Sequence, residues 1–139
     1  MSTSTSTAAP AGSRRLRLAL AGLFLLGVAV QFYLAGRGAF GASGGYDAHK
    51  AVGDALHGIS LIILIATVAV PATRNRVDVG LAVALFVLMT IQVAIATFSH
   101  PELGALHPFN ALLVTGAAAG MFSRDRRLGT VATPRPLDA

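Results

Sequence analysis

The chain has 139 residues, of which 54% are hydrophobic and only 12% are charged, about half the charged fraction of an ordinary soluble domain. This composition predicts one membrane-embedded domain rather than a soluble one. The absence of cysteine excludes disulfides, thiolate metal sites and haem attached covalently through C-x-x-C-H. The net charge of +5 comes mainly from arginines that flank apolar segments, so membrane topology explains it better than nucleic-acid binding does.

Four transmembrane helices are predicted between two polar tails. Residues 1–13 form a Ser/Thr/Ala tract that we expect to be disordered, and we expect the same of the tail 128–139. Between them lie four apolar stretches whose lengths match the roughly 30 Å hydrocarbon core of a bilayer. These predicted helices are 16–36, 47–70, 79–99 and 105–122. Pro71 ends the second helix, and Pro101 follows the third.

Short connections join antiparallel neighbours, so the sequence predicts an all-α polytopic membrane protein with a four-helix antiparallel bundle over 14–127. When both termini and the 72–78 loop are placed in the cytoplasm, nine of the eleven Lys and Arg residues lie there. They are Arg14, Arg15, Arg17, Arg74, Arg76, Arg124, Arg126, Arg127 and Arg135. Only Arg37 and Lys50 lie on the other side. The positive-inside rule therefore predicts a multi-pass protein of the plasma membrane with both termini cytoplasmic.

In this topology all four histidines fall in the outer half of the membrane or at its outer surface. His57 lies seventeen residues from Arg74, and His107 lies seventeen residues from Arg124, so both are about 25 Å from the inner surface. His49 and His100 lie nearer the outer water. Depth along the membrane therefore favours a pairing of His57 with His107.

A short internal repeat points to the same pair. Residues 55–58 read Ala-Leu-His-Gly in the second helix, and residues 105–108 read Ala-Leu-His-Pro in the fourth. Gln31 and Gln92 occupy similar apolar surroundings in the first and third helices. The first and second helices together are then predicted to repeat the third and fourth, about an axis along the membrane normal.

Facing imidazoles on two helices of a bundle are what a b-type haem requires, because its iron takes one nitrogen on each axial side. Gly53 would leave space for the flat ring, and Arg37 and Lys50 would balance the propionates. His49 and His57 are eight residues apart, about 80° around a helix, so they are not expected to share one iron. Either could face the fourth helix.

Three stretches carry a resemblance to known proteins. They are residues 31–36 (Gln-Phe-Tyr-Leu-Ala-Gly), 49–53 (His-Lys-Ala-Val-Gly) and 106–111 (Leu-His-Pro-Phe-Asn-Ala), with Gln92 before the last. On these residues the chain resembles a family of small, uncharacterised actinobacterial four-helix membrane proteins, and one four-helix half of haem A synthase. The resemblance implies that His49 and His107 ligate haem b. Lys50 stands where arginine is usual, and the second half and the cysteine pair of the synthase are missing, which argues against haem A synthesis itself.

The sequence thus favours an integral membrane b-type haem protein with bis-histidine ligation near the outer face. Its expected role is electron transfer or haem handling, and we do not expect it to be an enzyme by itself. A second interpretation is a zinc or copper site built from His49, His57, His100 and His107 with Asp47 or Glu102. A third is a helper subunit whose polar residues only join helices. The expected partner is the lipid bilayer, and a homo-oligomer or a larger membrane complex is compatible with the sequence.

Overall fold

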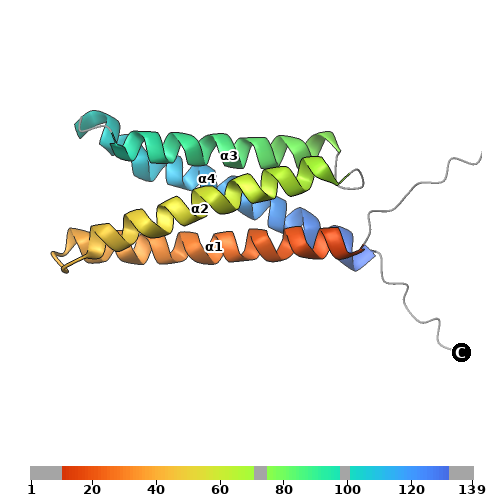
Figure 1. Cartoon of the computed structure of the whole chain (residues 1–139), viewed down its shortest axis with the longest axis horizontal. Helices are drawn as coiled ribbons and strands as arrows, with labels where there is room; N and C mark the ends of the chain where they lie inside the picture. Colours follow the sequence, from red (N-terminus) through yellow and green to blue (C-terminus); the bar gives the residue numbers. More distant parts are fainter. Residues whose placement is uncertain (1–10, 71–74, 98–100, 132–139) are drawn as a thin grey trace, which may run out of the picture.

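The computed structural model describes residues 11–70, 75–97 and 101–131, and within these ranges the regular elements are all helices (Figure 1). They are α1 (Ala11–Ala39), α2 (Gly45–Ala69), α3 (Arg76–Thr97) and α4 (Pro101–Val131). All four are long and apolar enough to cross a membrane. The predicted all-α fold with four membrane-spanning helices is therefore confirmed.

α1 and α4 extend furthest beyond their predicted ends, while α2 and α3 begin two and three residues earlier than predicted. α1 begins at Ala11 rather than at residue 16, and α4 runs from Pro101 to Val131 rather than over 105–122. The added turns contact each other, because the Arg14 guanidinium donates to the Leu128 carbonyl at 3.0 Å. Helix therefore replaces the expected tail over 11–13 and 128–131, and the rest of each tail lies outside the described residues.

The four helices form an antiparallel bundle in which each helix packs against two neighbours. α1 and α3 each contact α2 and α4, so α1 and α3 lie on one diagonal and α2 and α4 on the other. The start of α1 and the end of α4 lie together, beside the end of α2 and the start of α3 (Figure 1). We call this the termini end, and the opposite end, with residues 40–44, the turn end.

The turn between α1 and α2 depends on glycine. Gly41 and Gly44 have φ angles of 78° and 68°, a left-handed conformation that side chains with a Cβ rarely adopt. Gly45 then opens α2 against the backbone of α1, where a Cβ would lie 2.7 Å from the Gly38 nitrogen. The glycine-rich connection thus brings α2 into close contact with α1 at the turn end.

The buried residues reveal a pseudo-twofold relation between the α1–α2 and α3–α4 hairpins. Most buried positions of α1 recur in α3 at an offset of 61, and most of those of α2 recur in α4 at an offset of 58; the exceptions are Leu34, Gly45 and Asn110. The pairs are Arg17 with Asp78, Ala21 with Ala82, Phe24 with Leu85, Val28 with Met89, Leu56 with Val114, Ser60 with Ala118, Ile63 with Met121, and Thr67 with Asp125. The structure therefore contains two parallel repeats about an axis along the bundle, as expected from the sequence.

The register of this repeat differs from the sequence expectation. The Ala-Leu-His match aligned His57 with His107 at an offset of 50, whereas the buried positions of α2 and α4 align at 58. At that offset the equivalent of His107 is His49, and the equivalent of His57 is Thr115. The three-residue match is thus a coincidence of composition, and the buried face of each helix sets the true equivalence.

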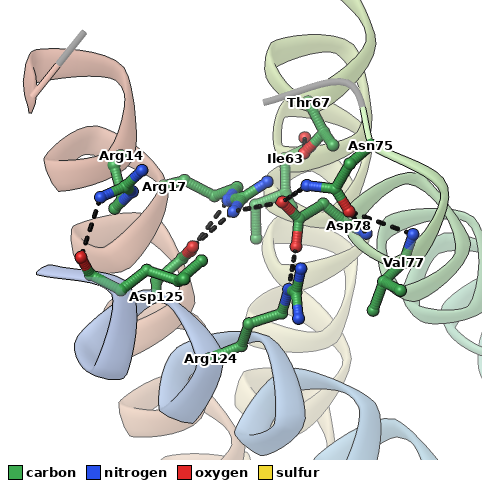
Figure 2. A network of polar contacts seen from close by, with 10 residues as sticks. Arg14, Arg17, Ile63, Thr67, Asn75, Val77, Asp78, Arg124 and Asp125 are labelled. Atoms are coloured by element: carbon green, nitrogen blue, oxygen red, sulfur yellow. Dashed lines mark hydrogen bonds and ion pairs between the residues drawn. The ribbon is translucent and has the colours of Figure 1, made fainter. Parts of the chain in front are cut away.

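An ion network joins three helices at the termini end (Figure 2). Arg17 of α1 holds Asp125 of α4 through two hydrogen bonds, with its Nε 2.8 Å from Oδ2 and its Nη2 on Oδ1. Arg17 Nη2 also lies 3.1 Å from Asp78 Oδ2 of α3. Arg17, Asp78 and Asp125 are each at most 3% exposed, so the network is part of the core.

The same network completes the start of α3 (Figure 2). Asn75 accepts the Asp78 backbone N–H at 3.0 Å and so caps the helix, and its side-chain amide donates to the Asp78 carboxylate. Arg124 donates to Asp78 at 2.6 Å. From the sequence, the arginine clusters were expected to report topology only. Two of these arginines instead neutralise two buried aspartates, since Arg17 and Arg124 balance Asp78 and Asp125.

Candidate functional site

A cavity of about 540 Å³ opens at the turn end and is lined by residues of all four helices. Val28, Leu56, Met89 and Val114 line it toward the bundle centre, one from each helix and in two symmetry-related pairs. Most of its lining is apolar. The polar side chains that line it include Gln31, His49, Lys50, Asp54, Gln92 and His107. Its volume lies within the roughly 300–1,000 Å³ of sites that bind small molecules and cofactors.

Two imidazoles face each other across the α2–α4 diagonal in this cavity. The ring centroids of His49 and His107 are 6.0 Å apart, with an angle of 55° between the ring planes. Because the two residues are equivalent in the pseudo-twofold repeat, they meet at the axis of the bundle. Of the two histidines predicted as partners of His107, the structure therefore brings His49 beside it.

The backbone of α1 orients the His49 ring. Its Nδ1 lies 3.1 Å from the carbonyl oxygen of Gln31, and since a carbonyl can only accept, Nδ1 carries the proton. The Nε2 of the neutral ring is then an unprotonated acceptor. A histidine whose Nδ1–H is held by a carbonyl, with Nε2 left open, has the arrangement common among metal-ligating histidines.

His107 has a buried ring nitrogen that lacks a hydrogen-bond partner. Nδ1 is shielded from solvent and meets no donor or acceptor among the described residues. Such an unsatisfied buried atom is rare in folded proteins and calls for a ligand, a water or an ion. His107 also lies next to Pro108, which interrupts the backbone hydrogen bonding of α4.

Gln92 and Asn110 support the backbone of α4 at this point. Gln92 donates through Nε2 to the His107 carbonyl at 3.0 Å, and Asn110 donates to Gln92 Oε1 at 2.6 Å and to the Leu88 carbonyl at 2.9 Å. These bonds tie α4 to α3 beside the proline. Asn110 was not predicted as a site residue, although it lies in the 106–111 stretch, three positions after His107.

The α1–α2 hairpin lacks the hydrogen-bond donor that Asn110 supplies in the α3–α4 hairpin. Val52 of α2 stands where α4 has Asn110, so Gln31, the equivalent of Gln92, has no matching donor. Accordingly, Gln31 Oε1 is a buried acceptor without a hydrogen-bond partner in the described structure. A Cβ at Gly53 would lie 2.8 Å from Gln31 Nε2, so the glycine makes room for this amide. Gly53 lines the cavity, but the space that its missing side chain leaves holds the Gln31 amide, and its predicted role beside a flat ring stays a prediction.

His57 lies away from the cavity, on the side where α2 meets α3. Its Nε2 is 3.1 Å from Thr90 Oγ1, and its ring stacks on Phe86 with centroids 5.4 Å apart. Thr90 Oγ1 in turn donates to the Phe86 carbonyl at 2.9 Å, so the Thr90 oxygen accepts from His57. His57 is therefore an interhelical contact that does not meet His107.

The remaining predicted site residues are dispersed. Lys50 lines the cavity and pairs with Asp54 at 2.6 Å. Arg37 does not line this cavity and instead borders a separate hollow at the end of α1. His100, expected in the alternative metal site, lies outside the described residues. Among the residues that are described, no three His, Asp or Glu side chains come together as a metal-binding group.

No curated protein and no solved structure matches the chain. Residues 31–99, which include Gln31, His49, His57 and Gln92, match the Family of unknown function (DUF6220).

Proposed function

We propose that this chain is an integral membrane protein that binds one b-type haem between His49 and His107. The observation that carries the proposal is the pair of imidazoles that meets at the bundle axis, with ring centroids 6.0 Å apart, in an apolar cavity. The resemblance of residues 49–53 and 106–111 to one half of haem A synthase supports the same two ligands.

The spacing of the two rings suits a shared metal. Because an imidazole nitrogen binds a metal ion at about 2 Å and lies about 1 Å from its ring centre, two imidazoles on opposite sides of one ion have centres about 6 Å apart. The unpartnered Nδ1 of His107 is a further reason to expect an additional group at this position. The two-ligand requirement of a b-type haem is met without a third protein side chain.

The chain's own residues would prepare the site in three ways. Gln31 fixes the His49 ring through its carbonyl, and Gln92 holds the backbone of His107. The apolar lining from four helices excludes water, which suits a porphyrin face. Lys50 stands at the cavity wall and offers a cation for a propionate, at the cost of its pairing with Asp54.

Bound haem would supply an iron that exchanges one electron. With both axial positions filled by histidine, the iron would have no open position for a substrate. We therefore propose electron transfer or haem handling rather than catalysis by this chain alone. Either role requires a further membrane or soluble partner that delivers or accepts electrons or haem.

The arginines support a cytoplasmic termini end. Arg14, Arg15, Arg76, Arg126 and Arg127 all belong to that end of the bundle, and the positive-inside rule favours the cytoplasm for it. In the plasma membrane, the histidine pair would then lie toward the outer face. This orientation forms part of the proposal.

An absorbance spectrum of the detergent-purified protein tests the haem directly. We expect a Soret band with sharp α and β bands after reduction, and we expect His49→Ala and His107→Ala each to remove or shift them. His57→Ala is the matched control, because it deletes another membrane histidine that does not line the cavity. A colourless protein with stoichiometric zinc or copper would replace the proposal by the metal alternative. A colourless and metal-free protein would favour a helper subunit.

A further inference from the structure

A second hollow, of about 430 Å³, lies beside the end of α1 at the turn end. It is lined by Phe32, Tyr33, Gly36, Arg37, Phe40 and Ala42. Gly36 leaves the space open, since a Cβ there would meet no atom within 4 Å. The hollow is separate from the histidine cavity, and only Phe32 lines both.

The hollow combines exposed aromatic rings with a cation. Phe40 is 94% exposed, and Phe32 and Tyr33 are at least half exposed, so the three rings lie open to the surrounding membrane. Arg37 lies in the last turn of α1, where the membrane-spanning segment ends. Aromatic rings and cations at this level are typical of the boundary between hydrocarbon and head groups.

Arg37 is an unbalanced charge within the described structure. Its guanidinium makes no ion pair and donates no side-chain hydrogen bond to any described residue, whereas the neighbouring cation Lys50 is neutralised by Asp54 at 2.6 Å. A guanidinium offers a planar fork of donors that matches the oxygens of a phosphate group. The hollow therefore presents a phosphate-binding group above an aromatic surface.

We propose that this hollow binds an anionic phospholipid, with the lipid phosphate on Arg37 and an acyl chain along Phe32 and Tyr33. Charge complementarity selects a lipid with net negative charge, because a zwitterionic head group would leave Arg37 unbalanced. Lipid, rather than free phosphate, also covers the aromatic rings. The site is independent of the haem proposal.

The chain lacks tryptophan, so Tyr33→Trp introduces a single local fluorophore into the hollow. The protein is reconstituted in phosphatidylcholine vesicles that contain increasing fractions of dibrominated phosphatidylglycerol, and the quenching is compared with that by dibrominated phosphatidylcholine. One arginine near an anionic surface contributes a binding free energy that corresponds to about a fivefold preference for phosphatidylglycerol. Phe40→Trp provides a second reporter if Tyr33→Trp does not fold.

Two further variants separate a specific site from general attraction. In the Tyr33→Trp background, Arg37→Gln should abolish the preference, while Arg126→Gln, which removes the same charge near the end of α4, should retain it. Equal quenching by the two brominated lipids overturns the proposal, as does a preference that survives Arg37→Gln. Added inorganic phosphate should leave the quenching unchanged. A loss of quenching on adding phosphate would instead assign the site to a soluble anion.

Discussion

Replacing Arg17 by methionine should strongly destabilise the bundle, because it strips a buried carboxylate of its counter-charge. Arg17 makes both hydrogen bonds to Asp125 and the 3.1 Å contact to Asp78. Without it, Asp78 keeps Arg124 and Asn75, whereas Asp125 retains no ion pair with any residue that the structure describes. Removing one partner of a buried ion pair costs about 3–5 kcal/mol, and we expect a loss of that size in the free energy of unfolding.

The complementary change removes both charges. Asp125→Leu alone leaves Arg17 with Asp78, so it should cost less, about 2–3 kcal/mol. The double variant Arg17→Met/Asp125→Leu buries neither charge, and replacing a buried pair by apolar side chains is often close to neutral. The two single losses, which add to about 5–8 kcal/mol, should therefore exceed the near-zero loss in the double variant by about that amount.

The assay is reversible SDS-induced unfolding in mixed micelles, followed by far-ultraviolet circular dichroism. Lys50→Met, Asp54→Leu and their combination form a matched cycle, because this pair is 75% and 52% exposed and should couple by only about 0.3–0.5 kcal/mol. A coupling between Arg17 and Asp125 no larger than that of the exposed pair would refute the buried network.

Two further predictions concern helix contacts. Gly45→Ala should cost about 1–3 kcal/mol of stability, because the new Cβ would lie 2.7 Å from the Gly38 backbone. Gly58→Ala is the control. A Cβ at Gly58 meets no atom within 4 Å, so this variant should gain up to about 1 kcal/mol of helix stability. Both are measured by the same unfolding assay, and similar effects for the two would contradict the close contact. Asn110→Leu should cost about 1–2 kcal/mol, since it leaves Gln92 Oε1 without its donor. An unchanged midpoint for that variant would show that this bond adds nothing.

Apolar run lengths were enough to predict the four helices, because a bilayer of fixed thickness requires spans of known length. They did not predict the ends of α1 and α4. Arginine is a good helix former, and Arg14 and Arg17 bind residues of α4, so both helices continue into the polar region. The ion partners of those arginines depend on which helices are neighbours, which hydropathy alone does not reveal.

The candidate site was predicted only in part, for a related reason. Membrane helices are apolar on their lipid face and on their packed face alike, so hydrophobic periodicity does not identify the inner side. Depth along α2 then favoured His57, although the 80° rotation between His49 and His57 decides which ring faces α4. His107 and Gln92 were both recognised from the sequence, and the motif resemblance favoured His49, which is the histidine that lies beside His107.

Low-temperature electron paramagnetic resonance of the oxidised, purified protein tests the central claim most directly, because it reports the axial ligands of a haem iron. We predict a low-spin ferric signal in the wild type and in His57→Ala. His49→Ala and His107→Ala should each convert any retained haem to a high-spin form, since one imidazole is lost. A high-spin wild type, or a low-spin signal that survives loss of His49 or His107 and disappears in His57→Ala, would contradict ligation by the pair at the bundle axis.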